Sequence, residues 1–146
     1  GRLVIEQLNL WAAQDALLDA LEAEDAFDVG GADEVTLGLG FPAEIQPEHV
    51  WIGGEAEGDI EAELTGPRPS AEIFRMPLFI LVQAADYEEA RSRVKTLAAA
   101  CESALETATF AAVVPSWRIP RYRLDAGTDG SNIQLCLELP VECRCW

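Results

Sequence analysis

The sequence contains few basic residues and almost no histidine. Ten lysines and arginines stand against 26 aspartates and glutamates, which gives the 146-residue chain a formal net charge of −16. Proteins bind nucleic acid and anionic lipid largely through lysine and arginine side chains that displace counterions from phosphates. The charge therefore argues against a protein that holds DNA, RNA or an anionic membrane. His49 is the only histidine, so a zinc site with two histidines is excluded.

Long apolar runs are also missing. Even the most hydrophobic run, Leu78 to Val82, is far shorter than the roughly 20 residues that cross a bilayer. The first residues include a glutamate at position 6 and no apolar stretch of signal-peptide length, so we expect no export. A length of 146 residues is typical of one domain, and we expect residues 1–146 to form a single domain with its own core.

Acidic residues are concentrated in the first half of the chain. Residues 1–66 contain 16 acidic residues and one arginine, whereas residues 67–146 contain ten acidic and nine basic residues. Aromatic residues such as Trp11, Phe27 and Trp51 lie within the acidic half, with aliphatic residues between them. Disordered segments are poor in aromatic residues, so we expect this half to fold.

Four cysteines raise the question of a metal site or of disulfides: Cys101, Cys136, Cys143 and Cys145. The last two lack the C-x-x-C spacing of zinc knuckles. Because they are two residues apart, they share one face of a strand and are expected to pack there as small apolar groups. We therefore expect reduced cysteines, with no metal and no cofactor.

The spacing of hydrophobic residues predicts two helices. Over residues 3–25, leucines recur at helical intervals. Residues 87–108 carry a single apolar stripe, and Asp86 with Glu89 resembles a capping box at its start. The second segment is the clearer helix of the two.

Other segments are expected to be extended. Residues 71–84 are dense in β-forming side chains, and residues 131–145 alternate apolar and polar side chains, so that one face of this strand belongs to the core. We expect strands at 35–39, 49–52, 71–84, 117–124 and 131–145, with turn-rich chain over 28–70 and a turn at 125–130.

This order of elements predicts an α+β fold, in which a mostly antiparallel sheet of about four strands packs against two helices. Pro77, Pro120 and Pro140 fall within predicted strands. Proline lacks the N–H that a sheet needs and is tolerated at edges or bulges. We therefore expect a sheet with exposed or interrupted margins, where another chain can dock.

Residues suited to catalysis are scarce. His49 lies beside the apolar residues 50–52 and is interpreted as a half-buried strand residue. Gly38 and Gly40 lack the third glycine and the following helix of a phosphate-binding loop. Carboxylates are plentiful and leave a glycosidase-like pair open, but abundance is no evidence of a site. We expect no enzyme.

An acidic row occupies alternate positions in the first half: Glu55, Glu57, Asp59, Glu61 and Glu63. In an extended chain these carboxylates point one way, roughly 6.6 Å apart, which is within the Debye length of about 8 Å, so they repel one another. Calcium needs about six to eight oxygens that converge on one point, and a straight row diverges. The row is interpreted as a solvated loop or as a negative surface along which DNA passes; a calcium site is less favoured.

A basic segment of the second half places three arginines among two aromatic residues: Trp117, Arg118, Arg121, Tyr122 and Arg123. Alone, this pattern is typical of single-stranded nucleic-acid binding. In so acidic a chain a protein interface is favoured, because arginine and aromatic residues are enriched at interfaces and residues 15–63 of another copy are complementary in charge. The alternative is an ordinary strand with a solvated basic face.

Four segments follow the N-terminal helix in a fixed order: His49-Val-Trp-Ile-Gly-Gly54 with its acidic run, Ala71 to Val82, Asp86 to Val94, and Ile133 to Arg144. Their order and the chain length resemble the tail terminator proteins of long-tailed bacteriophages, especially those of actinobacterial hosts. The resemblance covers residues 3–145. The basic segment and the terminal Cys-Arg-Cys-Trp depart from it, so no family role is carried onto them.

This resemblance implies a non-enzymatic virion protein that forms a hexameric ring at the head-proximal end of the tail tube, stops tube polymerisation and joins the tail to the head-side connector. It implies contacts with the tail tube protein and a head-to-tail stopper or connector, DNA passing through the lumen without specific binding, and assembly in the host cytoplasm without a membrane. A stopper or another neck or tube component fits the same residues. A cytosolic ligand-binding or hydrolase domain is the more distant alternative.

Overall fold

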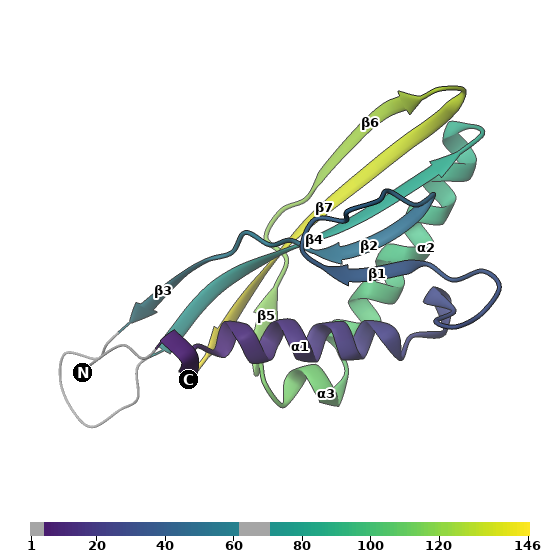
Figure 1. Ribbon diagram of the computed structural model, residues 1–146. Coiled ribbons are helices and arrows are strands. Elements are labelled where there is room, and N and C mark those ends of the chain that lie inside the picture. Colours follow the sequence, from purple (N-terminus) through teal and green to yellow (C-terminus); the bar gives the residue numbers. More distant parts are fainter. Residues whose placement is uncertain (1–4, 62–70) are drawn as a thin grey trace, which may run out of the picture.

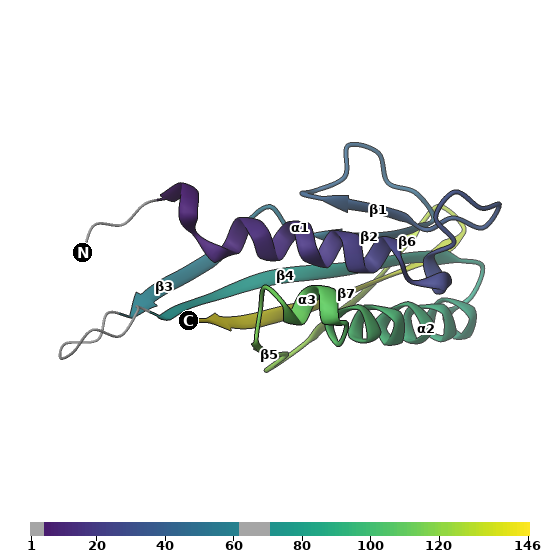
Figure 2. The ribbon, with the colours of Figure 1, turned by 90° about the horizontal axis from the view of Figure 1, so that it is seen from below.

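The structure is a computed structural model that describes residues 5–61 and 71–146. A seven-stranded sheet carries its helices on one face, and the other face, here called the open face, has no helix in the described part (Figures 1 and 2). The helices are α1 (Asn9–Glu22), α2 (Tyr87–Leu105), α3 (Ala108–Ala111) and the 3₁₀ helices η1 (Ile5–Gln7) and η2 (Asp25–Phe27). Among the described residues, no helix is both long and apolar enough to span a bilayer.

Two long antiparallel strands, β4 (Ala71–Ala84) and β7 (Asn132–Cys145), form the centre of the sheet. On one side of this pair, β2 and β3 follow one another along β4. On the other side, β5 and β6 follow one another along β7. β1 lies parallel to β2 at one edge of the sheet. The α+β class is confirmed, but the sheet is mixed and has more strands than predicted. The shorter strands are β1 (Thr36–Leu39), β2 (Glu48–Ile52), β3 (Glu57–Glu61), β5 (Ser116–Arg118) and β6 (Arg123–Asp129).

Pro77 and Pro140 face each other in the middle of the two long strands. The backbone N–H of Gly53 donates to the carbonyl of Pro77 (N···O 2.7 Å), so the backbone of Pro77 is turned away from β7, toward the gap between β2 and β3. Pro140 lies opposite the gap between β5 and β6. Both prolines lie in the central strands and not at an edge of the sheet, and they are accommodated because their missing N–H groups fall in gaps between the neighbouring strands. Pro120 lies in the second gap rather than within a strand.

The region after α3 differs from the prediction. The strand predicted at 117–124 is two strands, β5 and β6, separated by residues 119–122. The turn predicted at 125–130 is also wrong, because β6 pairs with β7 over its whole length and the turn is confined to Gly130 and Ser131. The composition of this stretch is typical of turns, but pairing with the next strand, β7, holds it extended.

Helix α1 is shorter than the segment 3–25 that leucine spacing predicts. It begins at Asn9, and Leu8, the residue before it, has no side chain that caps the helix. Instead the buried Glu72 carboxylate of β4 accepts hydrogen bonds from the backbone N–H groups of Asn9 (2.7 Å) and Leu10 (3.3 Å). A negative charge at this helix end satisfies free N–H groups and is favourable to the helix dipole. The start of α1 is therefore set by a residue more than 60 positions away.

Helix α2 begins at Tyr87, as predicted. The side chain of Asp86 caps it by accepting a hydrogen bond from the backbone N–H of Glu89 (2.8 Å). The helix ends at Leu105, earlier than the predicted residue 108. Thr107 then caps the separate short helix α3 through its hydroxyl group.

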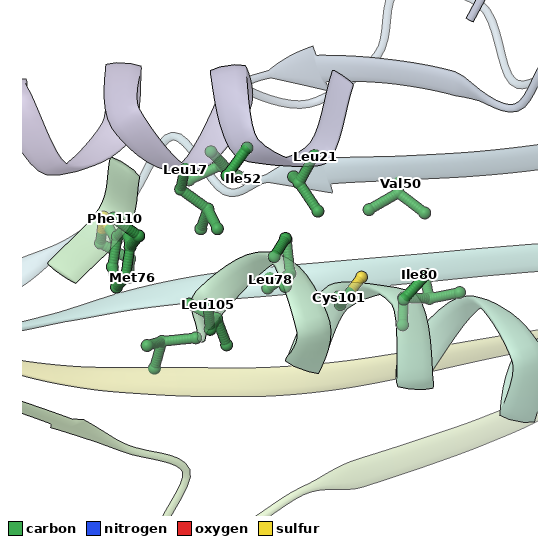
Figure 3. Close-up of a cluster of buried hydrophobic side chains, with 14 of the residues drawn as sticks. Leu17, Leu21, Val50, Ile52, Met76, Leu78, Ile80, Cys101, Leu105 and Phe110 are labelled. Carbon is green, nitrogen blue, oxygen red and sulfur yellow. The ribbon is translucent and has the colours of Figure 1, made fainter. Parts of the chain in front are cut away.

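The core lies between the sheet and the helix layer. Alternate residues of β2, β4 and β7 face the helices, and the apolar sides of α1 and α2 meet them. Surfaces for other molecules are therefore the open face, the sheet edges and the outer sides of the helices. Figure 3 labels ten buried residues of this layer: Leu17, Leu21, Val50, Ile52, Met76, Leu78, Ile80, Cys101, Leu105 and Phe110.

Candidate functional site

The predicted basic segment is divided between the core and the surface. Trp117 is half-buried and packs against the core from β5. Arg118 and Arg123 are exposed, and each forms an ion pair with a carboxylate, Glu142 and Asp125 respectively. The segment therefore does not present all its side chains on one surface.

Arg121 and Tyr122 lie between β5 and β6. Tyr122 is 75% exposed. Arg121 is exposed too, and in the part of the chain that the structure describes no carboxylate lies within ion-pair distance of its guanidinium group. An unpaired arginine in a chain with 26 acidic residues is a free cationic group that a partner can use.

The predicted acidic row is a sheet strand in its central part. Glu57, Asp59 and Glu61 occupy alternate positions of β3, which pairs with β4. Glu55 is exposed in the segment before β3, and Glu63 lies outside the described residues. The interpretation as a solvated loop is therefore wrong for the residues in β3, whereas the negative surface stays a proposal.

Four strands each contribute one residue to a row of alternating charge on the open face, here called the charge row: Glu57 (β3), Arg75 (β4), Glu142 (β7) and Arg118 (β5). Nε of Arg118 donates to one oxygen of Glu142 (2.8 Å), and Nε of Arg75 lies 3.3 Å from the other. These contacts lower the pKa of Glu142, above all the hydrogen bond from Arg118. No local sequence pattern marks the charge row, because strand register brings its members together.

A groove of about 1040 Å³ runs across the open face, next to the charge row. Apolar residues of β2 and β4 line it, including Trp51, Pro77 and Phe79, together with Arg121. The rings of Trp51 and Phe79 stack with centroids 5.0 Å apart, and Phe41 meets Trp51 edge-on at 5.9 Å. Its lining offers aromatic contact and charged groups, which is typical of protein interfaces. Sequence reasoning missed the groove because Phe41, Trp51 and Phe79 come from three separate segments.

His49 lies on the open-face side of β2 and is only 4% exposed, so it is more deeply buried than expected. Its ring contacts Trp51 edge-on at 5.5 Å, and its Nδ1 has no hydrogen-bond partner among the described residues. Burial lowers the pKa of His49 below its ordinary value of 6.5. The ring is therefore neutral at pH 7, and no described carboxylate orients it as a general base.

The cysteines are free thiols, and Cys136 is the one that is not fully buried. As expected, Cys143 and Cys145 share the helix-covered face of β7 and pack in the core. Burial raises the pKa of Cys101 and Cys143 to about 12 and that of Cys145 to about 11. Thiols with these pKa values are weak nucleophiles at neutral pH. Within the described part of the chain, no three metal-binding side chains cluster.

Comparisons with known proteins show that the fold of this chain is similar to that of a solved structure. No protein-family model matches the chain, and no curated protein matches it in sequence. Among solved structures, the chain is similar to one chain of the "Virion of native gene transfer agent (GTA) particle", with a TM-score of 0.60 and 17% identity. The superposition covers 94% of this chain and 97% of that chain, so the shared fold extends over nearly the whole of both.

Proposed function

We propose that the chain is a structural protein of a phage-like virion. Specifically, it is a tail terminator that forms a ring at the head-proximal end of the tail tube, ends tube polymerisation and joins the tail to the head-side connector. The observation that carries this proposal is the likeness in fold, along nearly the whole chain, to a chain of a gene transfer agent virion. The order of segments that resembles tail terminators, with His49 to Gly54 among them, supports the same function.

The surface of the molecule suits assembly. The open face carries an aromatic groove and has no helix over it in the described part of the chain. A ring of identical subunits needs two different patches on each subunit that fit each other. The basic segment at 118–123 and the acidic residues of 15–61 supply patches of opposite charge.

A hexameric ring would carry a net charge of −96, six times −16. A wall of this sign repels phosphate, so DNA passes through the lumen without specific binding. The proposed partners are other copies of the chain, the tail tube protein and a head-to-tail stopper or connector, and the proposed place is the neck of the virion. In this role the chain acts by contact and not by catalysis.

Tube assembly tests this function. The full chain is added to the polymerising tail tube subunit of the same particle, and tube lengths are measured by negative-stain electron microscopy. We expect a ring at one end of each tube and shorter tubes of more uniform length. A chain that binds the stopper and leaves tube length unchanged would favour the stopper or neck role, and a chain that binds neither protein would contradict a place in the tail.

A further inference from the structure

We propose that the ring closes through the two free edges of the sheet, with β1 of one copy adding to β6 of the next. The occupant of each edge is therefore a second copy of this chain. This inference rests on the proposed ring and names the surfaces through which its subunits meet.

The two strands lie at opposite ends of the sheet (Figure 1). β1 pairs with β2 alone and β6 with β7 alone, and among the described residues neither strand forms backbone hydrogen bonds on its other side. All seven residues of β6 are exposed. A head-to-tail ring needs two unlike surfaces on each subunit, and the two edges supply one for each neighbour.

β1 is an edge strand whose protection is its short length of four residues. Natural sheets protect free edges with short strands, charged residues, prolines or bulges. The strand Thr36-Leu-Gly-Leu39 has no charged residue and no proline, and the nearest charged residues are Glu34 before it and Glu44 after it. In a chain of net charge −16, an uncharged edge strand is a surface where two copies approach without strong repulsion.

Apolar side chains on the two edges would meet in the continued sheet. Leu39 lies opposite Ile52, and Leu124 lies opposite Leu137, so both leucines project on the helix-covered side of the sheet. Leu39 is 50% exposed and Leu124 is 44% exposed in the single chain. Pairing of β1 with β6 places the two side chains on the same face of one sheet and removes apolar surface from water.

Charge complementarity favours the same pair of edges. The segment before β6, residues 107–122, contains two arginines and no acidic residue, whereas β6 itself holds Arg123, Asp125 and Asp129, the first two of which form an ion pair. Arg121, two residues before β6, has no ion-pair partner in the described part of the chain. Acidic residues flank β1 on both sides, with Asp33 before the strand and Glu44 after it. Either direction of strand pairing therefore brings a carboxylate toward the start of β6, where Arg121 of the next copy lies.

Lysine substitutions on the two edges test the contact. Leu39→Lys and Leu124→Lys each place a charge on one proposed edge, and Ile60→Lys is the control, because Ile60 is 44% exposed on β3, outside the contact. Mass is measured by light scattering after size-exclusion chromatography, at equal concentrations of each full-length variant. We expect the wild type and Ile60→Lys to keep the ring mass, and the two edge variants to fall to the 15.9 kDa of one chain with unchanged circular dichroism.

A charge-reversal series tests the same contact without relying on the fold of the lysine variants. Arg121→Glu is expected to reduce the ring fraction at least tenfold at a fixed concentration. Adding either Asp33→Arg or Glu44→Arg to Arg121→Glu is expected to restore the ring fraction. The substitution that restores it shows whether β1 and β6 pair in the parallel or the antiparallel direction.

The outcomes separate this inference from the proposed function. The β1–β6 contact would be contradicted if rings persist in both edge variants. It would also be contradicted if Arg121→Glu reduces the ring fraction and neither second change restores it. Neither result would contradict the proposed ring itself. A wild-type chain that keeps the mass of one chain at every concentration, and also with the tube subunit, would overturn the ring itself.

Discussion

Gly53 approaches β4 closely, just after β2 ends. Its N–H donates to Pro77 in the gap between β2 and β3. A Cβ atom at this position would lie 2.6 Å from Cγ of Pro77 and 2.8 Å from Cε2 of Phe79. At Gly54 the nearest atom to a Cβ would be Cα of Gly40, at 3.7 Å, which is an ordinary contact. The two adjacent glycines of the His49–Gly54 segment thus have different roles.

We predict that Gly53→Ala lowers the free energy of unfolding by about 1–3 kcal/mol, because Pro77 and Phe79 must move to accept the methyl group. Gly54→Ala, the matched control, should change it by less than about 1 kcal/mol. Urea unfolding followed by circular dichroism measures both. Equal effects of the two substitutions would contradict the close approach at Gly53.

His49 links stability to pH. Its pKa in the folded chain lies below the ordinary value of 6.5 because the ring is buried. Below pH 6.5 the unfolded chain therefore binds a proton at this site more readily than the folded chain, and acidification favours unfolding. Well above pH 6.5 the ring is neutral in both states, so His49 no longer makes stability depend on pH.

We predict that the wild type loses stability relative to His49→Gln as pH falls from about 7.5 to about 5. The free energy of unfolding is measured in urea for both proteins at each pH. Since the 26 acidic residues titrate in both proteins, the difference between the two curves isolates His49. A difference that does not change with pH would show that burial of His49 has no such effect.

At the scale of elements, the predictable parts are those with regular burial. β7 alternates between core and surface, and α2 carries one apolar stripe, so local spacing predicts both. β6 has no such signal because all its residues are exposed, and β7 alone holds it extended. For the candidate site, composition identifies the basic segment and the acidic row, but the charge row depends on the registers of four strands, which no local pattern contains.

Register also separates two neighbouring carboxylates of β3. Glu57 lies opposite Arg75, whereas Asp59 lies opposite Ile73. We predict that Glu57→Gln lowers the free energy of unfolding by a few tenths to about 1 kcal/mol, and that Asp59→Asn leaves it unchanged or raises it, because Asp59 mainly repels other acidic residues. Thermal unfolding at low and high salt measures the stability of both variants. The difference between them should become smaller as salt screens the charges. Equal shifts in both variants would show that the register with Arg75 has no electrostatic effect.

At the scale of the whole molecule, the two faces of the sheet differ in what covers them. The helix-covered face closes the core, whereas no helix of the described residues covers the open face (Figures 1 and 2). The negative charge is concentrated in the first half of the chain, and the arginines near β5 and β6 lie at the far edge of the sheet from β1. This polarity suits subunits that meet head to tail around a channel.

The native mass of the full chain, alone and with the tail tube subunit, tests the proposed ring most directly. We expect a closed assembly of about 95 kDa, six chains of 15.9 kDa each, which binds to tube ends. A single species of 15.9 kDa under both conditions would contradict it.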